Sequence, residues 1–232
     1  MSLPDKIIPI PCSDKEGWSE CWDTPKRRNL LNIPHSWSGF FIGPPSSGKS
    51  TMIKNLILRA KPRFREVLVY HFDPDSSSEW DDVDAKYLTE FPDPKSFDRN
   101  KKRLLILEDL NLKQMGKEDR AKLNRLCGYT RSHCNLSVAI TAQNPYDLDA
   151  SIRRMANLIV LWKSADMNSL KTLASRTGLK ASHVEFVMLH LCKQPHDSLM
   201  IDLQRNSPAP YRINGYTPVT LQQLDEAVKL TK

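Results

Sequence analysis

A short segment of the chain has the residue types and spacing of a phosphate-binding loop. Residues 43–50 satisfy the pattern G-x-x-x-x-G-K-[ST]. In such loops, backbone N–H groups and a helix N-terminus hold the phosphates, Lys49 adds a positive charge, and the Ser50 hydroxyl coordinates Mg²⁺. We expect a nucleotide site made of Gly43, Pro44, Pro45, Ser46, Ser47, Gly48, Lys49, Ser50 and Thr51. Within it, the side chain of Thr51 is expected to pack or hydrogen-bond on the helix.

Two acidic residues supply the carboxylates that nucleotide hydrolysis needs in addition to a phosphate loop. Glu108 and Asp109 directly follow the apolar run 104–107. The end of a buried strand lies at the sheet edge where open α/β folds bind ligands. We therefore expect Glu108 to hold Mg²⁺ and Asp109 to orient or deprotonate the attacking water. Acids at such positions also serve as loop starters or helix caps, but the upstream phosphate loop favours catalysis.

A polar segment follows the next apolar run. Residues 136–142 are followed by Gln143-Asn144-Pro145. A polar side chain at a strand end can lie between the γ-phosphate and the attacking water, which makes Gln143 a candidate sensor and Asn144 the alternative. Ordinary Asn-Pro turn formation is the competing interpretation.

Arginines flank this strand on both sides. Arg131 precedes it and Arg153 follows it. A guanidinium stabilises the charge that spreads over a transferring phosphoryl group, and in ring ATPases it often comes from a neighbouring subunit. Either arginine is a candidate for this role, with a salt bridge or a contact to DNA as the alternative.

The elements that position these residues follow from the pattern of apolar runs. Strands are expected at 38–42, 66–72, 103–107, 136–142, 157–162 and 198–203. Helices are expected at 49–60, 117–131, 149–155, 168–176, 181–191 and 220–232. Nearly continuous apolar strands that alternate with helices predict an α/β fold with a mostly parallel sheet covered on both faces. We divide the chain into an irregular N-terminal arm (1–35), a P-loop ATPase domain (36–216) and a C-terminal helical tail (217–232).

The composition favours a globular protein that acts on a polyanion. The chain has 232 residues, 34 of them Lys or Arg and 27 Asp or Glu, for a net charge of +7 and an isoelectric point near 9.1. Its apolar runs are far shorter than the roughly 20 residues that span a bilayer, and it begins without a secretory signal pattern. Five cysteines without a C-x-x-C pair argue against a disulfide framework, and the cluster Cys127, His133 and Cys134 is expected to be structural.

The order of these motifs resembles a known family. The segments GPPSSGKST, RLLILEDLN, RSHCNLSVAITAQNPYDLDASIRRMANLIVLWK and HDSLMIDLQ are similar to the poxvirus-type genome-packaging ATPases of large DNA viruses and virophages, within the FtsK/HerA superfamily. The resemblance covers about residues 36–216. It departs from the family in the acidic pair, where the superfamily usually has Asp first, so the division of roles between Glu108 and Asp109 stays open.

The resemblance implies a RecA-like ATPase core that forms a homo-oligomeric ring and pumps double-stranded DNA, independently of sequence, into a preformed capsid. ATP and Mg²⁺ would be its cofactors, and capsid proteins its further partners. The implied location is the interior of the host cell at the site of virion assembly, with association with the virion left open and secretion excluded.

The motifs leave other classes of protein open, including a non-motor binding module. A superfamily 3 replication helicase also has a Gly-Pro-rich phosphate loop and a Glu-containing acidic pair, but its third motif would end in Asn with little sheet after it, whereas here Gln143 is followed by two further strands. A small-molecule kinase would carry an arginine-rich lid, and no segment separates as one. Another DNA-dependent P-loop ATPase is also compatible with these motifs.

Overall fold

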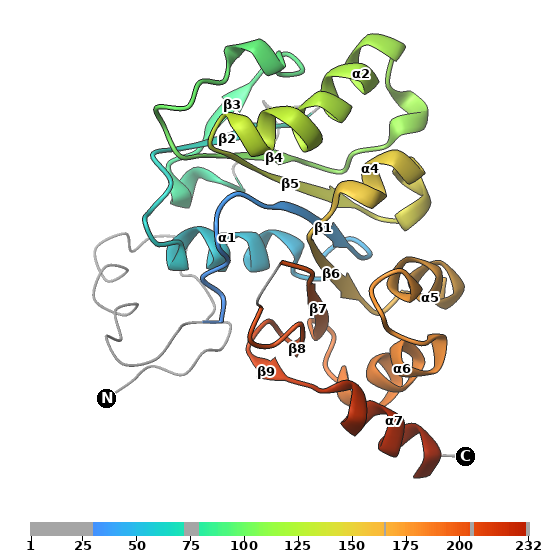
Figure 1. Ribbon diagram of the computed structural model, residues 1–232. Helices are drawn as coiled ribbons and strands as arrows, with labels where there is room; N and C mark the ends of the chain where they lie inside the picture. Colours follow the sequence, from blue (N-terminus) through green and yellow to red (C-terminus); the bar gives the residue numbers. More distant parts are fainter. Residues whose placement is uncertain (1–29, 72–78, 165, 205–206, 231–232) are drawn as a thin grey trace.

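One nine-stranded sheet organises the molecule (Figure 1). The computed structural model describes residues 30–71, 79–164, 166–204 and 207–230. The strands are β1 (Ser38–Ile42), β2 (Glu66–Tyr70), β3 (Lys86–Leu88), β4 (Arg103–Leu107), β5 (Leu136–Ala142), β6 (Leu158–Trp162), β7 (Ser198–Asp202), β8 (Tyr211–Ile213) and β9 (Thr217–Pro218). Their order in the sheet is β3-β2-β4-β5-β1-β6-β7-β8-β9. All six strands expected from the sequence are present, and the short strands β3, β8 and β9 are additional.

The sheet is parallel through its first six positions and antiparallel beyond them. From β3 to β6 every neighbouring pair is parallel, and β1 lies between β5 and β6. Strands β7, β8 and β9 pair antiparallel to one another, and β7 pairs antiparallel to β6. The expected mostly parallel α/β sheet is therefore confirmed, with an antiparallel edge built by the C-terminal part of the chain.

Helices cover both faces of the sheet. They are α1 (Lys49–Arg59), α2 (Lys117–Arg125), α3 (Arg131–His133), α4 (Ala150–Met155), α5 (Met167–Ser175), α6 (Ala181–Phe186) and α7 (Leu221–Leu230). Figure 1 shows α1 on one side of the sheet and α2, α4 and α5 on the other. The π-helical segment η6 (Leu126–Thr130) joins α2 to α3, and a second one, η8 (Val187–Leu191), continues α6. The helices expected at 117–131 and 181–191 thus exist, each with a widened turn.

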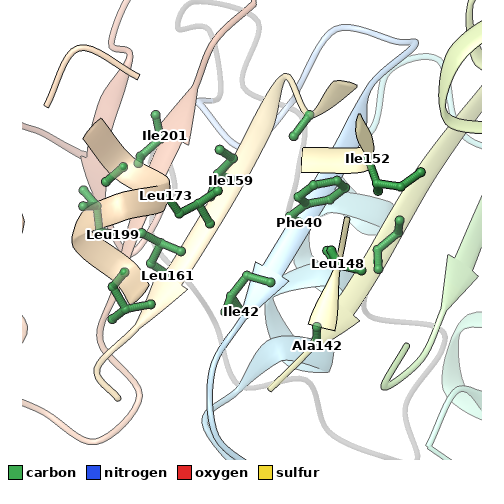
Figure 2. Packing of buried hydrophobic residues seen from close by; sticks show 14 of the residues in the cluster. Phe40, Ile42, Ala142, Leu148, Ile152, Ile159, Leu161, Leu173, Leu199 and Ile201 are labelled. Atoms are coloured by element: carbon green, nitrogen blue, oxygen red, sulfur yellow. The ribbon is translucent and has the colours of Figure 1, made fainter. Parts of the chain in front are cut away.

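The two faces of the sheet carry separate apolar clusters, which explains why the strands are apolar almost throughout. Strand β1 alternates between them, because Phe40 and Ile42 belong to one cluster and Phe41 to the other. Figure 2 shows Phe40 beside Ile152 of α4. All five residues of β1 are buried, so the strand that leads into the phosphate loop is held on both faces.

Both ends of the described chain pack onto this core. Leu31 and Ile33, within the segment expected to be the arm, are buried. Near the other end, Asp225 of α7 accepts a hydrogen bond from Nε2 of His183 at 2.9 Å and pairs with Lys180. Residues 1–29 of the expected arm lie outside the described residues, and the domain boundaries stay predictions. Within the described part of the chain, no helix is long and apolar enough to cross a bilayer.

Candidate functional site

The phosphate loop connects β1 to α1, as its sequence predicts. Its two glycines are needed for different reasons. At Gly43 a Cβ atom would lie 2.8 Å from both Ser47 Oγ and Trp162 Cβ, so a larger residue does not fit. Gly48 has a φ of 99°, a left-handed conformation that favours glycine, and it directly precedes α1. The residues of the motif therefore determine the shape of the loop as well as its chemistry.

Lys49 lies across the loop with its ammonium group inside the fold. Its Nζ donates hydrogen bonds to the carbonyl oxygens of Gly43 at 2.9 Å and Pro44 at 3.0 Å. Burial lowers the pKa of Lys49, and the negative charges of Asp109, Glu79 and Glu108 oppose that shift. A cation held between this loop and three carboxylates is placed to bind a phosphate.

The acidic pair lies at the carboxyl end of β4, where the sequence predicts it. Glu108 is half-buried and its backbone N–H donates to Tyr70 O of β2 at 3.0 Å. Burial raises the pKa of Glu108, and the indole of Trp80 partly offsets this rise. Asp109 is exposed and has a φ of 42°, and its N–H donates to Thr141 Oγ1 of β5 at 2.8 Å. The two acids thus occupy distinct environments, one partly desolvated and one open to solvent.

A single cleft of about 690 Å³ brings the loop and the acidic pair together. It is lined by loop residues 45–51, by Glu108 and Asp109, and by Glu79, Thr141, Trp162 and His196. Indole Nε1 of Trp162 donates to the carbonyl oxygen of His196 at 3.2 Å, which ties the end of β6 to the loop before β7. The oxygen donors of Ser50 and Glu108 share this cleft, and Mg²⁺ prefers such hard oxygen ligands. Both residues therefore fit the magnesium role expected of them.

Four of the cleft residues were not expected from the sequence. Thr141 and Trp162 are at or near the ends of β5 and β6, the two strands that flank β1. A correct strand order would have pointed to both of them. Glu79 and His196 lie on loops without a motif, and no sequence signal identifies them.

The candidate sensor lies outside this lining. Gln143 is exposed and follows the end of β5, whereas Thr141, two residues earlier, lines the cleft. The alternative, Asn144, caps the short helix η7 (Pro145–Asp147), because its Oδ1 accepts from the N–H of Tyr146 at 2.9 Å. Asn144 therefore has the turn role that the Asn-Pro pair indicated, and the sensor role of Gln143 stays a prediction.

The candidate arginines also lie outside the lining of the cleft. Arg153 of α4 donates to the carbonyl oxygens of Pro145 and Leu148 and lies 5.3 Å from the ring centre of Tyr146. Arg131 donates from Nε to the carbonyl oxygen of Cys127 at 3.0 Å, and burial lowers its pKa. Arg131 precedes β5, so it lies toward the sheet edge opposite the cleft. The catalytic role of either guanidinium therefore stays a prediction.

The cysteine and histidine cluster has a packing role. Cys127 is fully buried, and burial raises the pKa of its thiol to about 12. His133 stacks on Tyr129 with ring centres 4.3 Å apart. Within the described ranges, no group of three or more His, Cys, Asp and Glu side chains could hold a metal ion.

The fold and the loop together define a P-loop NTPase-like α/β domain. The DNA-packaging ATPase B204 from Sulfolobus Turreted Icosahedral Virus has a similar fold, with a TM-score of 0.57 and 18% identity over 80% of this chain and 99% of that one. The genome-packaging NTPase B204 of Sulfolobus turreted icosahedral virus 2, in complex with ATP-γS, has a TM-score of 0.54 at 18% identity, covering 80% of this chain and 98% of that one.

The likeness extends to larger ATPases. The pCW3 conjugation coupling protein TcpA, bound to ATPγS, has a TM-score of 0.53 and 16% identity over 88% of this chain and 67% of that chain. No protein-family model matches this chain, and no curated protein matches it by sequence. At these identities the comparisons establish the fold alone, which agrees with the expected α/β core of a P-loop ATPase.

Proposed function

We propose that this chain is an ATP-driven translocase of double-stranded DNA that packages a viral genome into a preformed capsid. The observation that carries the proposal is the cleft in which Lys49, Ser50 and the acidic pair meet, in a fold that spans nearly the whole of a viral packaging ATPase. Poxvirus-type membership, the homo-oligomeric ring and the capsid partners are parts of this proposal that rest on the motif resemblance.

The residues of the cleft divide the work of ATP hydrolysis. Lys49 and the loop N–H groups bind the β- and γ-phosphates, and they stabilise negative charge as the γ-phosphoryl group transfers. Ser50 and Glu108 would hold Mg²⁺, which supplies further neutralisation of phosphate charge when it is bound. Asp109, open to solvent at the cleft, is placed to orient or deprotonate the attacking water.

The supporting geometry favours this division of the acidic pair. Glu108 is partly desolvated at the end of the buried strand β4, and a partly desolvated carboxylate is stabilised by a nearby cation. Asp109 is oriented by its left-handed backbone and by the hydrogen bond from its N–H to Thr141. The reversed order of the acids relative to the usual family pattern therefore has a consistent structural interpretation.

The decisive experiment is electron microscopy of the purified chain with duplex DNA and a non-hydrolysable ATP analogue, alongside an ATPase assay with and without duplex. We expect closed rings around the duplex and hydrolysis that DNA stimulates. A chain that hydrolyses ATP but forms no ring and ignores duplex DNA would contradict translocation and leave a simpler NTPase. Preferential unwinding of forked DNA would instead favour the helicase alternative.

A further inference from the structure

The loops at the amino ends of β2 and β4 form a basic surface on the side of the sheet away from the nucleotide cleft. We define the basic edge as Lys61, Arg63, Arg65, Arg99 and Lys101, all of which are exposed. Segments 61–65 and 98–102, which contain these residues and Lys102, hold six basic side chains and one acid, Asp98. We propose that the basic edge binds the phosphate backbone of duplex DNA.

Hydrogen bonds join these loops into one surface. The backbone N–H of Arg65 donates to Lys102 O at 2.8 Å, which places the two basic segments side by side. The side chain of Asn135, just before β5, donates to Arg99 O at 3.4 Å. Because separate loops are held together in this way, their cations face solvent as a group.

A buried cation adds positive potential beneath this surface. Lys102 is buried, its ammonium group donates to Pro62 O, and it lies 4.7 Å from the ring centre of Phe64. Its ammonium group thus contacts a carbonyl oxygen and an aromatic ring. Burial lowers the pKa of Lys102. A charge kept away from solvent is weakly screened, so it strengthens the field at the surface above it.

The nearby acids are mostly neutralised by other cations. Glu66 pairs with Arg103 at 2.8 Å and with Lys86 at 2.9 Å, and Asp98 pairs with Arg103 at 3.2 Å. A groove of about 280 Å³ beside Arg63 and Arg65 is also lined by Asp82 and Asp84.

Of the three acids that line this groove, Glu66 is paired as described and Asp82 pairs with Lys54 at 2.9 Å, which leaves the exposed Asp84. Among the described residues, no ion pair engages Arg63, Arg65, Arg99 or Lys101. The edge therefore keeps a net positive charge that a polyanion can neutralise.

The chemistry of the edge fits a phosphate backbone without base recognition. Long Lys and Arg side chains on loops bind phosphates as charges and carry no sequence information. Strand β4 connects the edge to the acidic pair, since its five residues lie between Lys102 and Glu108. At about 3.3 Å per residue, this strand spans roughly 17 Å. A mechanical force on DNA bound at the basic edge would thus be transmitted along β4 to the acidic pair.

The inference rests on the proposed function only in taking duplex DNA as the polyanion. The test is fluorescence anisotropy of a labelled duplex with the full chain over a range of salt concentrations. The test variant is Arg63→Gln with Lys101→Gln. The control, Arg176→Gln with Lys229→Gln, removes the same charge from exposed positions elsewhere. ATP hydrolysis without DNA and thermal melting are measured for each protein.

We expect the test variant to bind duplex about tenfold more weakly at low salt and to lose about two units of the log–log salt slope. The control variant should match the wild type, and the test variant should retain DNA-independent ATP hydrolysis and its melting temperature.

Three results would overturn the assignment. Equal weakening in both variants would show that only net charge matters. Unchanged duplex affinity with altered sedimentation in the test variant would make the edge a contact between copies of this chain. Failure of the wild type to bind duplex, with ATP hydrolysis intact, would remove the DNA part of the proposed function together with this surface.

Discussion

The two edges of the parallel sheet, at the carboxyl and amino ends of its strands, carry opposite charge. Their charged groups also differ in how far they are enclosed by the fold. At the carboxyl edge, Glu79, Glu108 and Asp109 surround a single buried ammonium group, that of Lys49, inside a cleft. At the amino edge, the basic residues are exposed and no cleft encloses them as a group. A reaction centre needs fixed, partly desolvated groups, whereas binding of a sliding polyanion needs only mobile charges at the surface. This difference indicates catalysis at the carboxyl edge and binding of a polyanion at the amino edge.

Removing the cation of the carboxyl edge should have the largest effect. Lys49→Ala leaves the phosphates without their buried positive charge, and loss of one such preorganised electrostatic group typically costs about 10²–10³ in turnover. We expect ATP hydrolysis to fall below detection in a steady-state phosphate-release assay. Arg176→Ala, which removes an exposed cation far from the cleft, serves as the control and should keep wild-type hydrolysis. Full DNA-stimulated hydrolysis by Lys49→Ala would refute the nucleotide site.

The acidic pair should separate nucleotide binding from turnover. Glu108→Gln and Asp109→Asn keep the shape of each side chain and remove its charge. We expect Asp109→Asn to slow turnover by about 10²–10⁴-fold, the usual contribution of general acid–base catalysis. Glu108→Gln should slow it by about 10²–10³-fold, the typical cost of losing one electrostatic group at a reaction centre. Binding of a fluorescent ATP analogue should persist in both variants.

The same pair of variants can also assign the two roles. If Glu108 holds Mg²⁺, Glu108→Gln alone should raise the Mg²⁺ concentration needed for half-maximal analogue binding. The opposite result, with only Asp109→Asn sensitive to Mg²⁺, would exchange the assignments.

The two candidate arginines test whether the carboxyl edge of one subunit is completed by a residue of a neighbouring subunit. Mixtures of Arg153→Ala subunits with Lys49→Ala subunits should recover part of the hydrolysis that neither variant shows alone, if Arg153 acts on a neighbour's nucleotide. The same mixture made with Arg131→Ala tests the arginine before β5. Absence of recovery at every ratio would leave Arg153 with its local role, in which its guanidinium donates to the carbonyl oxygens of Pro145 and Leu148.

The sequence predicts the strands and the motifs, but it does not predict which strands lie side by side in the sheet. Each of the six expected strands exists, because burial on both faces makes its pattern continuous and apolar. The phosphate loop and the acidic pair were placed correctly by their position after a strand. Strand order, however, depends on pairing between distant segments, and no local pattern encodes that β1 lies between β5 and β6.

That limit explains which residues of the site were missed. Trp162 reaches the cleft only because β6 lies beside β1, and His196 only because β7 returns antiparallel beside β6. Gln143 was selected because it follows a strand, yet the residue of that strand that faces the cleft is Thr141. Gln143 lies beyond the end of β5, in the turn that leads into η7, so the strand pattern does not determine where its side chain points.

Thr141 provides the smallest and most specific test of the carboxyl edge. Thr141→Val keeps the volume and removes the hydroxyl that accepts the N–H of Asp109 at 2.8 Å. Loss of this hydrogen bond should cost about 1 kcal/mol of stability, measured by urea denaturation. Because Asp109 has a left-handed backbone that the bond helps to hold, we expect turnover to fall several-fold while ATP-analogue affinity stays near the wild-type value.

Thr141→Ser is the matched control, since it retains the hydroxyl and should keep turnover close to that of the wild type. Equal turnover in Thr141→Val would mean that the position of Asp109 is set without this bond. A loss in Gln143→Ala larger than that in Thr141→Val would support the sensor role of Gln143. The order of these two losses therefore ranks the two side chains by their contribution to turnover.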